Sequence, residues 1–307
     1  MASSPFTRLR HRLVLAGGRA ASAPAEAAQG RREEARIVPA RLIEAPLRHI
    51  ALGTPVAWQE DVAFLDGTQH VELVGYGGTD PIIAAVIQAA VRLRHSRRMQ
   101  HAVSAERRIV IGRREALLGL GDALDHHEIV PLDDEPPHPI RDLERANAVV
   151  DKARARLEIE VAAAFRATTV DCWLVIDGSL AASPDWANDA RMLGVVKSHA
   201  SLPFDGPELE TYLTLPLGHR SSIFQPESRR VTPLYAWGLR LHDFVGRDLF
   251  YGLVRIEASA TDATLATADT ISRHLLAERA PLADDRRADR LLYGIHDVER
   301  YLRARRA

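Results

Sequence analysis

Residues 62–78 read VAFLDGTQHVELVGYGG, and this stretch sets the fold class that we expect. Two apolar runs rich in β-branched and aromatic residues flank an Asp-Gly pair, Asp66 and Gly67. Such runs around a tight-turn dipeptide predict a strand, a short turn and a second strand. We therefore expect a β-hairpin at the start of the central sheet.

Two helices are predicted in the part of the chain that follows this hairpin. Residues 81–94, PIIAAVIQAAVRLR, begin with proline and carry apolar residues at helical spacing. In residues 142–167, apolar side chains recur at alternating steps of three and four, which is the pattern of an amphipathic helix. Residues 121–144 are acidic and contain four prolines, so we expect an exposed loop there.

The remaining apolar segments predict more strands and then two C-terminal helices. The strand candidates are RRIVIG (107–112), VDCWLVIDGSL (170–180), MLGVVKSH (192–199), LETYLTLPLG (209–218), LYAWGLRLHD (234–243) and LFYGLVRIEAS (249–259). The helix candidates are ATLATADTISRHLLAER (263–279) and IHDVERYLRARR (295–306). This order predicts a mixed α/β domain in which helices flank a central mixed β-sheet.

Composition narrows the class of protein. The chain has 307 residues, 46% of them apolar, and a formal net charge of -1, so charge alone does not indicate nucleic acid binding. No apolar run approaches the roughly 20 residues that span a bilayer, so we expect no membrane segment. Cys172 is the single cysteine, which excludes disulfides within one chain and fits a reducing cytoplasm. We assign residues 1–45 to a basic, partly flexible N-terminal arm and residues 46–307 to one domain.

Two aspartates are the first candidates for chemistry. Asp66 and Asp177 each end an apolar strand and precede glycine and a small hydroxyl residue, so both carboxylates should emerge at an edge of the sheet. Hard divalent cations prefer carboxylate oxygens, and such cations support phosphodiester cleavage. The alternative for Asp66 is an ordinary hairpin turn, because Asp-Gly is the commonest short turn signal. That alternative fits Asp177 less well, since no return strand follows it at once.

A glutamate in the middle helix is the third candidate. Counting from Leu143 in alternating steps of three and four leads to Glu160, which falls where an apolar residue is expected. A lone charge on a buried stripe is costly unless it is paired or binds a metal. The alternatives are a salt bridge between Glu160 and a core-facing arginine, or a place at the edge of the stripe. Glu158 is expected to face solvent.

The other motifs give weaker evidence for a functional site. The segment DHHE at 125–128 contains metal-ligating residue types, but it lies in the acidic loop without a partner at ligand spacing. The glycine patterns of nucleotide-binding loops and the GxSxG nucleophile motif are absent from the sequence.

In their order along the chain, these motifs resemble the bacterial branch of the NurA nucleases, from about residue 55 to the C-terminus. Besides the helix of Glu160, the resemblance is carried by FLDGTQHVE, LVIDGSL, LGVVKSH, LPLGHRSSIF, YAWGLRL, YGLVRIEAS and RRADRLLYGIHDVERYLR. It implies an RNase H-like fold and a manganese-dependent or magnesium-dependent DNA nuclease, acting as an exonuclease and single-strand endonuclease. It also implies a homodimer that works with a HerA-type hexameric ATPase on DNA ends, in repair or defence.

The resemblance also assigns roles to residues. It makes Asp66, Glu160 and Asp177 the metal-binding and catalytic acids. Asp285, in the C-terminal motif, is a fourth catalytic candidate. The positions that match recurring family residues with a role in DNA binding are Lys197, Arg220, Arg240 and Arg255, the last paired with Glu257.

One departure from the family pattern bears on activity. A histidine usually stands before the C-terminal Asp-x-Arg-Ala segment, and here Ala283 occupies that position. Asp284, Asp285, His274 or His296 could replace it. Two alternatives to a nuclease follow: a catalytically degenerate subunit that binds DNA and a partner ATPase without cleaving, and a hydrolase of another substrate with an apolar pocket.

Overall fold

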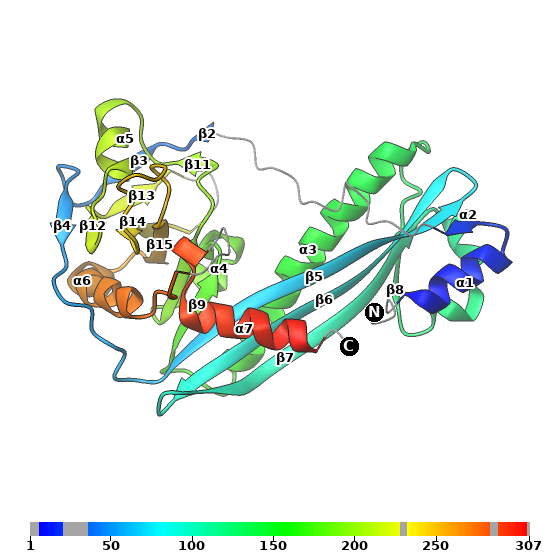
Figure 1. Ribbon diagram of the computed structural model, residues 1–307, viewed down its shortest axis with the longest axis horizontal. Helices are drawn as coiled ribbons and strands as arrows, with labels where there is room; N and C mark the ends of the chain where they lie inside the picture. Colours follow the sequence, from blue (N-terminus) through cyan, green and yellow to red (C-terminus); the bar gives the residue numbers. More distant parts are fainter. Residues whose placement is uncertain (1–5, 21–35, 228–231, 283–287, 306–307) are drawn as a thin grey trace.

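The computed structural model describes residues 6–20, 36–227, 232–282 and 288–305, and it has two layers of helices around one large mixed sheet (Figure 1). In order along the sheet, the main strands are β3 (Ala40–Leu42), β13 (Phe224–Pro226), β14 (Leu234–Arg240), β15 (Leu253–Ser259), β10 (Met192–Val196), β9 (Trp173–Asp177), β5 (Val62–Gly77), β6 (Asp80–His95), β7 (Arg98–Gly112) and β8 (Glu128–Pro131). Short strands β1 (Arg19–Ala20), β4 (His49–Ala51) and β12 (His219–Ser221) join its margins, and β2 (Arg36–Ile37) pairs with β11 (Ser201–Leu202). The mixed α/β prediction is confirmed.

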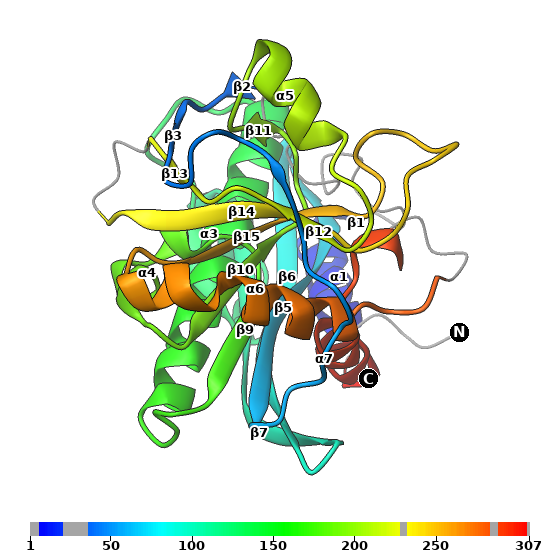
Figure 2. The same ribbon diagram turned by 90° about the vertical axis from the view of Figure 1, so that its left-hand side faces the viewer.

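The helices cover the two faces of this sheet. They are α1 (Thr7–Leu15), α2 (Arg114–Leu118), α3 (Pro139–Arg166), α4 (Pro184–Asn188), α5 (Gly206–Leu213), α6 (Asp262–Ala277) and α7 (Tyr293–Ala304), with short 3-10 turns between some of them. In Figure 2, α6 lies in front of the sheet, and α3 and α7 lie on opposite sides of the long strands. None of the helices in the described ranges is long and apolar enough to cross a membrane.

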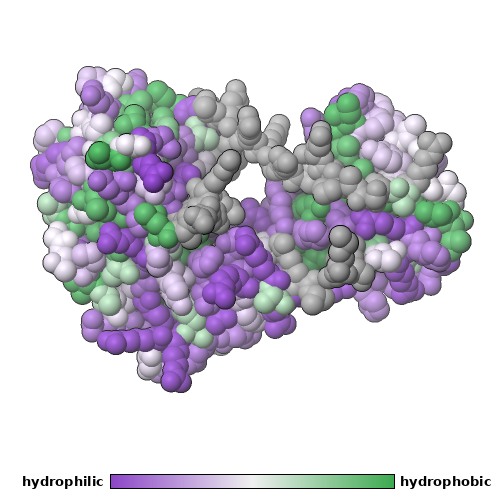
Figure 3. Space-filling model, viewed as in Figure 1, coloured by the Kyte–Doolittle hydropathy of each residue, from purple (hydrophilic) through white to green (hydrophobic). Residues whose placement is uncertain are grey.

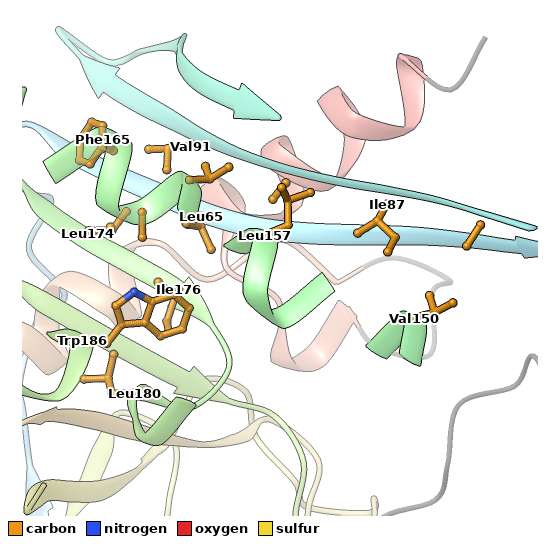
Figure 4. Close-up of a cluster of buried hydrophobic side chains, with 14 of the residues drawn as sticks. Leu65, Ile87, Val91, Val150, Leu157, Phe165, Leu174, Ile176, Leu180 and Trp186 are labelled. Carbon is orange, nitrogen blue, oxygen red and sulfur yellow. The ribbon is translucent and has the colours of Figure 1, made fainter. Parts of the chain in front are cut away.

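The long helix α3 makes one core with the sheet. Its Val150 and Leu157 pack with Leu65 of β5 and Ile87 of β6 (Figure 4). Each fully buried aliphatic side chain of this kind contributes about 1.5–3 kcal/mol. On the opposite face, α6 and α7 pack on β9, β10, β14 and β15 in a second core. The sheet between them is thereby buried on both faces.

Three strands, β5, β6 and β7, extend far beyond the rest of the sheet as an arm (Figure 1). At the far end, α1 and α2 cover the arm in a third core that includes Phe6, Leu9 and Leu13. These described parts of the predicted N-terminal arm therefore pack on the domain. The division of the chain at residue 45 stays a prediction.

The structure of β5 and β6 contradicts two of the sequence predictions. Asp66 and Gly67 do not form a turn, because β5 continues through them as one strand that pairs with β6. Residues 81–94 form β6 and not a helix. An element covered on both faces is apolar throughout, and its sequence no longer separates a strand from a helix. The predicted strand at 209–218 is also wrong, since its first half belongs to α5. The other predicted strands and helices lie on observed elements of the same type.

Candidate metal and phosphate site

The fold brings Asp66 and Asp177 together where the sheet divides. β9 runs parallel to β5 with Leu65 opposite Ile176, so the two aspartates are the next residues on neighbouring strands. β9 ends at Asp177, whereas β5 continues into the arm. Within the described ranges no strand pairs with this edge of β5 from Asp66 to Val74. The end of one strand and the free edge of the other thus leave an opening beside both carboxylates.

A pocket of about 520 Å³ occupies this opening. Its charged lining comes from six separate elements or loops: Asp66, Arg154, Asp177, Lys197, Arg290 and Glu299. The space-filling view shows the surface hollowed between the larger lobe and the arm, with hydrophilic side chains along its lower border (Figure 3). Because charged groups line the pocket, its chemistry suits an ionic ligand and does not suit an apolar substrate.

Asp66 is the most deeply placed of these groups. Its side chain is 8% exposed, and Oδ1 accepts a hydrogen bond of 2.8 Å from the Gly67 amide. Burial and then the negative charge of Asp177 raise the pKa of Asp66 well above its usual value, while Lys197 opposes the rise. A carboxylate destabilised in this way gains from a nearby cation.

Asp177 is paired with a cation, the ammonium of Lys197. The Nζ of Lys197 lies 2.7 Å from Oδ2 of Asp177. Glu257 holds the turn after Asp177 by accepting hydrogen bonds from Ser179 Oγ at 2.7 Å and from the Leu180 amide at 3.0 Å. Glu257 therefore fixes the backbone that presents Asp177.

The structure places Glu158 of α3, and not the predicted Glu160, beside Asp66. Glu158 is 8% exposed and pairs with Arg154 at 2.6 Å, and burial raises its pKa. Glu160 faces another direction, where it pairs with Arg107 at 2.7 Å and with Arg156 at 3.1 Å. The expectation that Glu158 faces solvent is wrong. The salt-bridge alternative for Glu160 matches the structure.

Glu158 also explains the glycine after Asp66. A Cβ at Gly67 would lie 2.2 Å from Oε1 of Glu158 and 2.8 Å from its Cγ. A larger residue at position 67 would have to displace the Glu158 side chain, so the glycine fits the close approach of α3 to β5 and does not form a turn. The sequence signal for Asp-Gly was real, but its cause lies in tertiary packing.

Among the four predicted DNA-binding cations, only Lys197 lines this pocket. Arg240 is fully buried, and its guanidinium donates to the carbonyls of Leu213, Leu215, Leu249 and Tyr251. Arg220 is buried and pairs with Glu44 and Asp269. A buried guanidinium engaged by protein groups cannot reach a phosphate, so the prediction is corrected for both. Arg255 is bound to Glu257 at 3.0 Å and to the carbonyl of Ser201.

Three cationic or acidic residues at the pocket were missed by the sequence analysis: Arg154, Arg290 and Glu299. Each stands on an amphipathic helix or in a loop, where charged residues are common and give no separate signal. Asp285, together with Ala283 and Asp284, lies outside the described residues. Of the proposed histidine substitutes, His274 stacks on Trp58 and does not line the pocket, whereas Nδ1 of His296 lies 4.0 Å from Glu299 Oε2.

The donor atoms at this site suit a hard divalent cation. Mg²⁺ in particular is held by one or two carboxylates, and water and substrate phosphate complete its shell. Asp66 and Asp177 supply that minimum. In the described part of the chain no three His, Cys, Asp or Glu side chains are grouped closely enough to hold an ion by themselves. This applies to the DHHE segment as well, so that segment is no metal site of its own.

Comparison with known proteins yields a likeness in fold. No family model matches the sequence, and no curated protein matches it. Among solved structures, the chain is similar to the NurA nuclease from Sulfolobus solfataricus, with a TM-score of 0.51 over 81% of this chain and 80% of that chain. The identity over this match is 9%. The chain has a NurA-like fold. The expected RNase H-like mixed sheet flanked by helices is thereby confirmed.

Proposed function

We propose that this protein is a divalent-metal-dependent deoxyribonuclease. One observation carries the proposal: Asp66 and Asp177 stand side by side in a pocket that Lys197, Arg154 and Arg290 also line, on a fold similar to that of a NurA nuclease. DNA is a polyanion, and its cleavage requires charge stabilisation on the attacked phosphate. Carboxylates for a metal and guanidinium groups for phosphate are the two kinds of group that this chemistry uses.

The roles of the side chains follow from their places around the pocket. Asp66 and Asp177 would hold Mn²⁺ or Mg²⁺, and Glu158 of α3 adds a further negative charge beside them that favours a bound cation. Such an ion, when bound, activates water and stabilises the leaving oxygen. Arg154 and Arg290 lie in the pocket wall, where they orient the phosphodiester by charge-assisted hydrogen bonds. Glu257 keeps the turn after Asp177 in place.

The wider biological setting is proposed on the motif resemblance. We expect a cytoplasmic homodimer that acts on DNA ends together with a HerA-type hexameric ATPase, as an exonuclease and single-strand endonuclease. A specific observation favours one second candidate, a degenerate subunit that binds DNA without cleaving it. The ammonium of Lys197 already neutralises Asp177, and Ala283 stands where the family pattern has histidine.

A cleavage assay distinguishes the two candidates. The purified protein is incubated with linear and circular DNA in Mn²⁺ or Mg²⁺, with and without the partner ATPase. Asp66→Asn and Asp177→Asn should each reduce cleavage by more than about a hundredfold, since even outer groups at metal sites contribute 10–100-fold. Glu160→Gln is the matched control, because it removes a carboxylate of α3 that faces Arg107, and it should keep full activity. Circular dichroism checks that the variants fold.

The outcome that contradicts the proposal is equally definite. If the wild type cleaves and both aspartate variants cleave equally well, the carboxylate pair is not the active site. If the wild type binds DNA and the partner but never cleaves, the degenerate subunit is the correct assignment.

A further inference from the structure

The acidic side chains around the pocket are in ion pairs, with Asp66 as the exception among the described residues. Glu158 pairs with Arg154, and Glu299 of α7 pairs with Arg303. Asp177 pairs with Lys197. Asp66, by contrast, has no ion-pair partner among the described residues, although Lys197 acts on its charge as well. One ammonium group thus serves two neighbouring carboxylates.

Lys197 combines a fixed backbone with a side chain that can move. The residue directly follows β10, whose Val195 pairs with Asp177 of β9. Arg290 donates a hydrogen bond of 2.9 Å from Nη1 to the carbonyl of Lys197. The ammonium stands on a flexible four-carbon stem, and the pocket beside it holds about 520 Å³. The Lys197 backbone is therefore held in place, while the ammonium, now on Asp177, has room to move into the pocket.

A divalent cation and this ammonium cannot share the same carboxylate oxygen. The ammonium sits on Oδ2 of Asp177, and a cation held by this carboxylate and by Asp66 would lie close to it, where two positive charges repel each other strongly. A divalent cation in excess would displace the ammonium, because it carries twice the charge and would engage Asp66 as well. The ammonium then has to leave Asp177 and enter the pocket.

We propose that Lys197 is an exchangeable counter-ion of the Asp66–Asp177 pair: it neutralises Asp177 when no divalent cation is bound and is displaced into the pocket when one binds. In the pocket its nearest suitable anion is the phosphate of the substrate, and this last step rests on the proposed nuclease function. The exchange itself requires only that a divalent cation bind. Lys197 would then contact the substrate only after the metal is in place.

The alternative is that Lys197 and Asp177 form a static salt bridge, and this alternative makes a different prediction for metal affinity. If Lys197 competes with the metal, its removal leaves the carboxylates permanently available. A competitor that occupies the site nine-tenths of the time weakens apparent affinity about tenfold. Lys197→Met should therefore bind Mg²⁺ and Mn²⁺ about tenfold more tightly than the wild type in calorimetry. Under a static salt bridge, the same variant would disturb Asp177 and bind metal no better.

The sequence offers a direct way to observe the exchange. Lysine occurs only at positions 152 and 197, so protein labelled with ¹³C at lysine Cε gives two side-chain signals. Lys152 is exposed on α3 and provides the control, and Lys152→Arg assigns the spectrum. On titration with Mg²⁺ in the absence of DNA, the Lys197 signal should shift and saturate with the calorimetric binding curve, while the Lys152 signal stays in place. Lys152→Met should leave metal affinity unchanged.

The possible results separate this inference from the proposed function. If Mg²⁺ binds while the Lys197 signal stays unchanged, or if Lys197→Met binds metal no more tightly, the exchange is refuted, whether or not DNA is cleaved. If Lys197 moves with metal but DNA is never cleaved, the exchange stands and the nuclease assignment fails. If neither protein binds Mg²⁺ or Mn²⁺, both are refuted.

Discussion

The close approach of Gly67 to Glu158 leads to a sharp prediction for Gly67→Ala. The new Cβ would lie 2.2 Å from Oε1 of Glu158, 2.8 Å from Cγ and 2.9 Å from Cδ. An ordinary contact needs about 3.4 Å, so the carboxylate has to move by about 1.2 Å and lose its 2.6 Å bond to Arg154. Overpacking of this kind costs about 1–3 kcal/mol. The free energy of unfolding should fall by that amount.

A double-mutant cycle in urea denaturation isolates the contact. Glu158→Ala removes Cγ, Cδ and Oε1, so Gly67→Ala in that background should cost less than about 0.5 kcal/mol. Glu160→Ala is the matched background, because it shortens a glutamate of the same helix that points elsewhere, and the full cost of Gly67→Ala should persist there. An equal cost in all three backgrounds would refute the placement of Glu158 over Gly67. The choice of Glu158 as the helix acid would fall with it.

Three further predictions concern the site and its support. The folded-state pKa of Asp66 is raised, so the stability that the protonated Asp66 contributes is complete below its unfolded pKa near 4 and is lost as pH rises through its folded pKa. The free energy of unfolding of the metal-free wild type should therefore fall above about pH 4, and Asp66→Asn should make this fall shallower. Parallel pH profiles of the two proteins in urea denaturation from pH 4 to 8 would contradict this. Arg240→Met leaves two buried and two partly buried carbonyls without their donor, so it should lower the free energy of unfolding in urea by about 3 kcal/mol or more. A loss below about 1 kcal/mol would argue against the structural role of Arg240. Glu257→Gln weakens the support of the turn after Asp177, so Mg²⁺ affinity in calorimetry should drop by about 10–100-fold, and an unchanged affinity would show that the turn holds without it.

The fold class followed from the sequence because most elements carry a single clear period. α6 and α7 each bury one face, and β14 and β15 are short apolar runs between turn signals, so pattern and structure agree. β6 has no such signature because its residues are buried on both faces by helices from distant parts of the chain. That information lies in the tertiary structure and is absent from a local window.

The error at the helix acid has a geometric cause. A count in alternating steps of three and four has a mean of 3.5 residues, whereas a straight helix has 3.6, so the count drifts by about 20° per seven residues. Between Leu143 and Glu160 this drift reaches roughly 50°. The buried stripe of α3 instead continues through Leu157, Val161 and Phe165. Glu158 then borders the stripe toward β5, and Glu160 borders it toward β7.

The wrong prediction of Arg240 and Arg220 as DNA-binding residues has a related cause. Arg240 and Arg220 occur in apolar strand sequences, and nothing in those sequences shows whether a guanidinium meets carbonyls, carboxylates or solvent. Asp66 and Asp177 were within reach because both end a run of apolar residues on neighbouring strands. The sequence thus locates an acid at the end of an apolar run better than it distinguishes a structural arginine from one that contacts a ligand.

The continuity of β5 has a mechanical consequence. A hairpin turn at Asp66 and Gly67 would have been a joint, but the strand passes through them and stays paired with β6 as far as Gly77, with a shift in register between Leu73 and Gly75. From residue 66 to residue 77 is 11 residues, or about 36 Å at roughly 3.3 Å per residue. One continuous paired strand therefore joins the end covered by α1 and α2 to a carboxylate of the pocket, with no loop between them. A displacement of that far end has a direct path through the strand to Asp66, with the register shift at Leu73 and Gly75 as the irregularity along it.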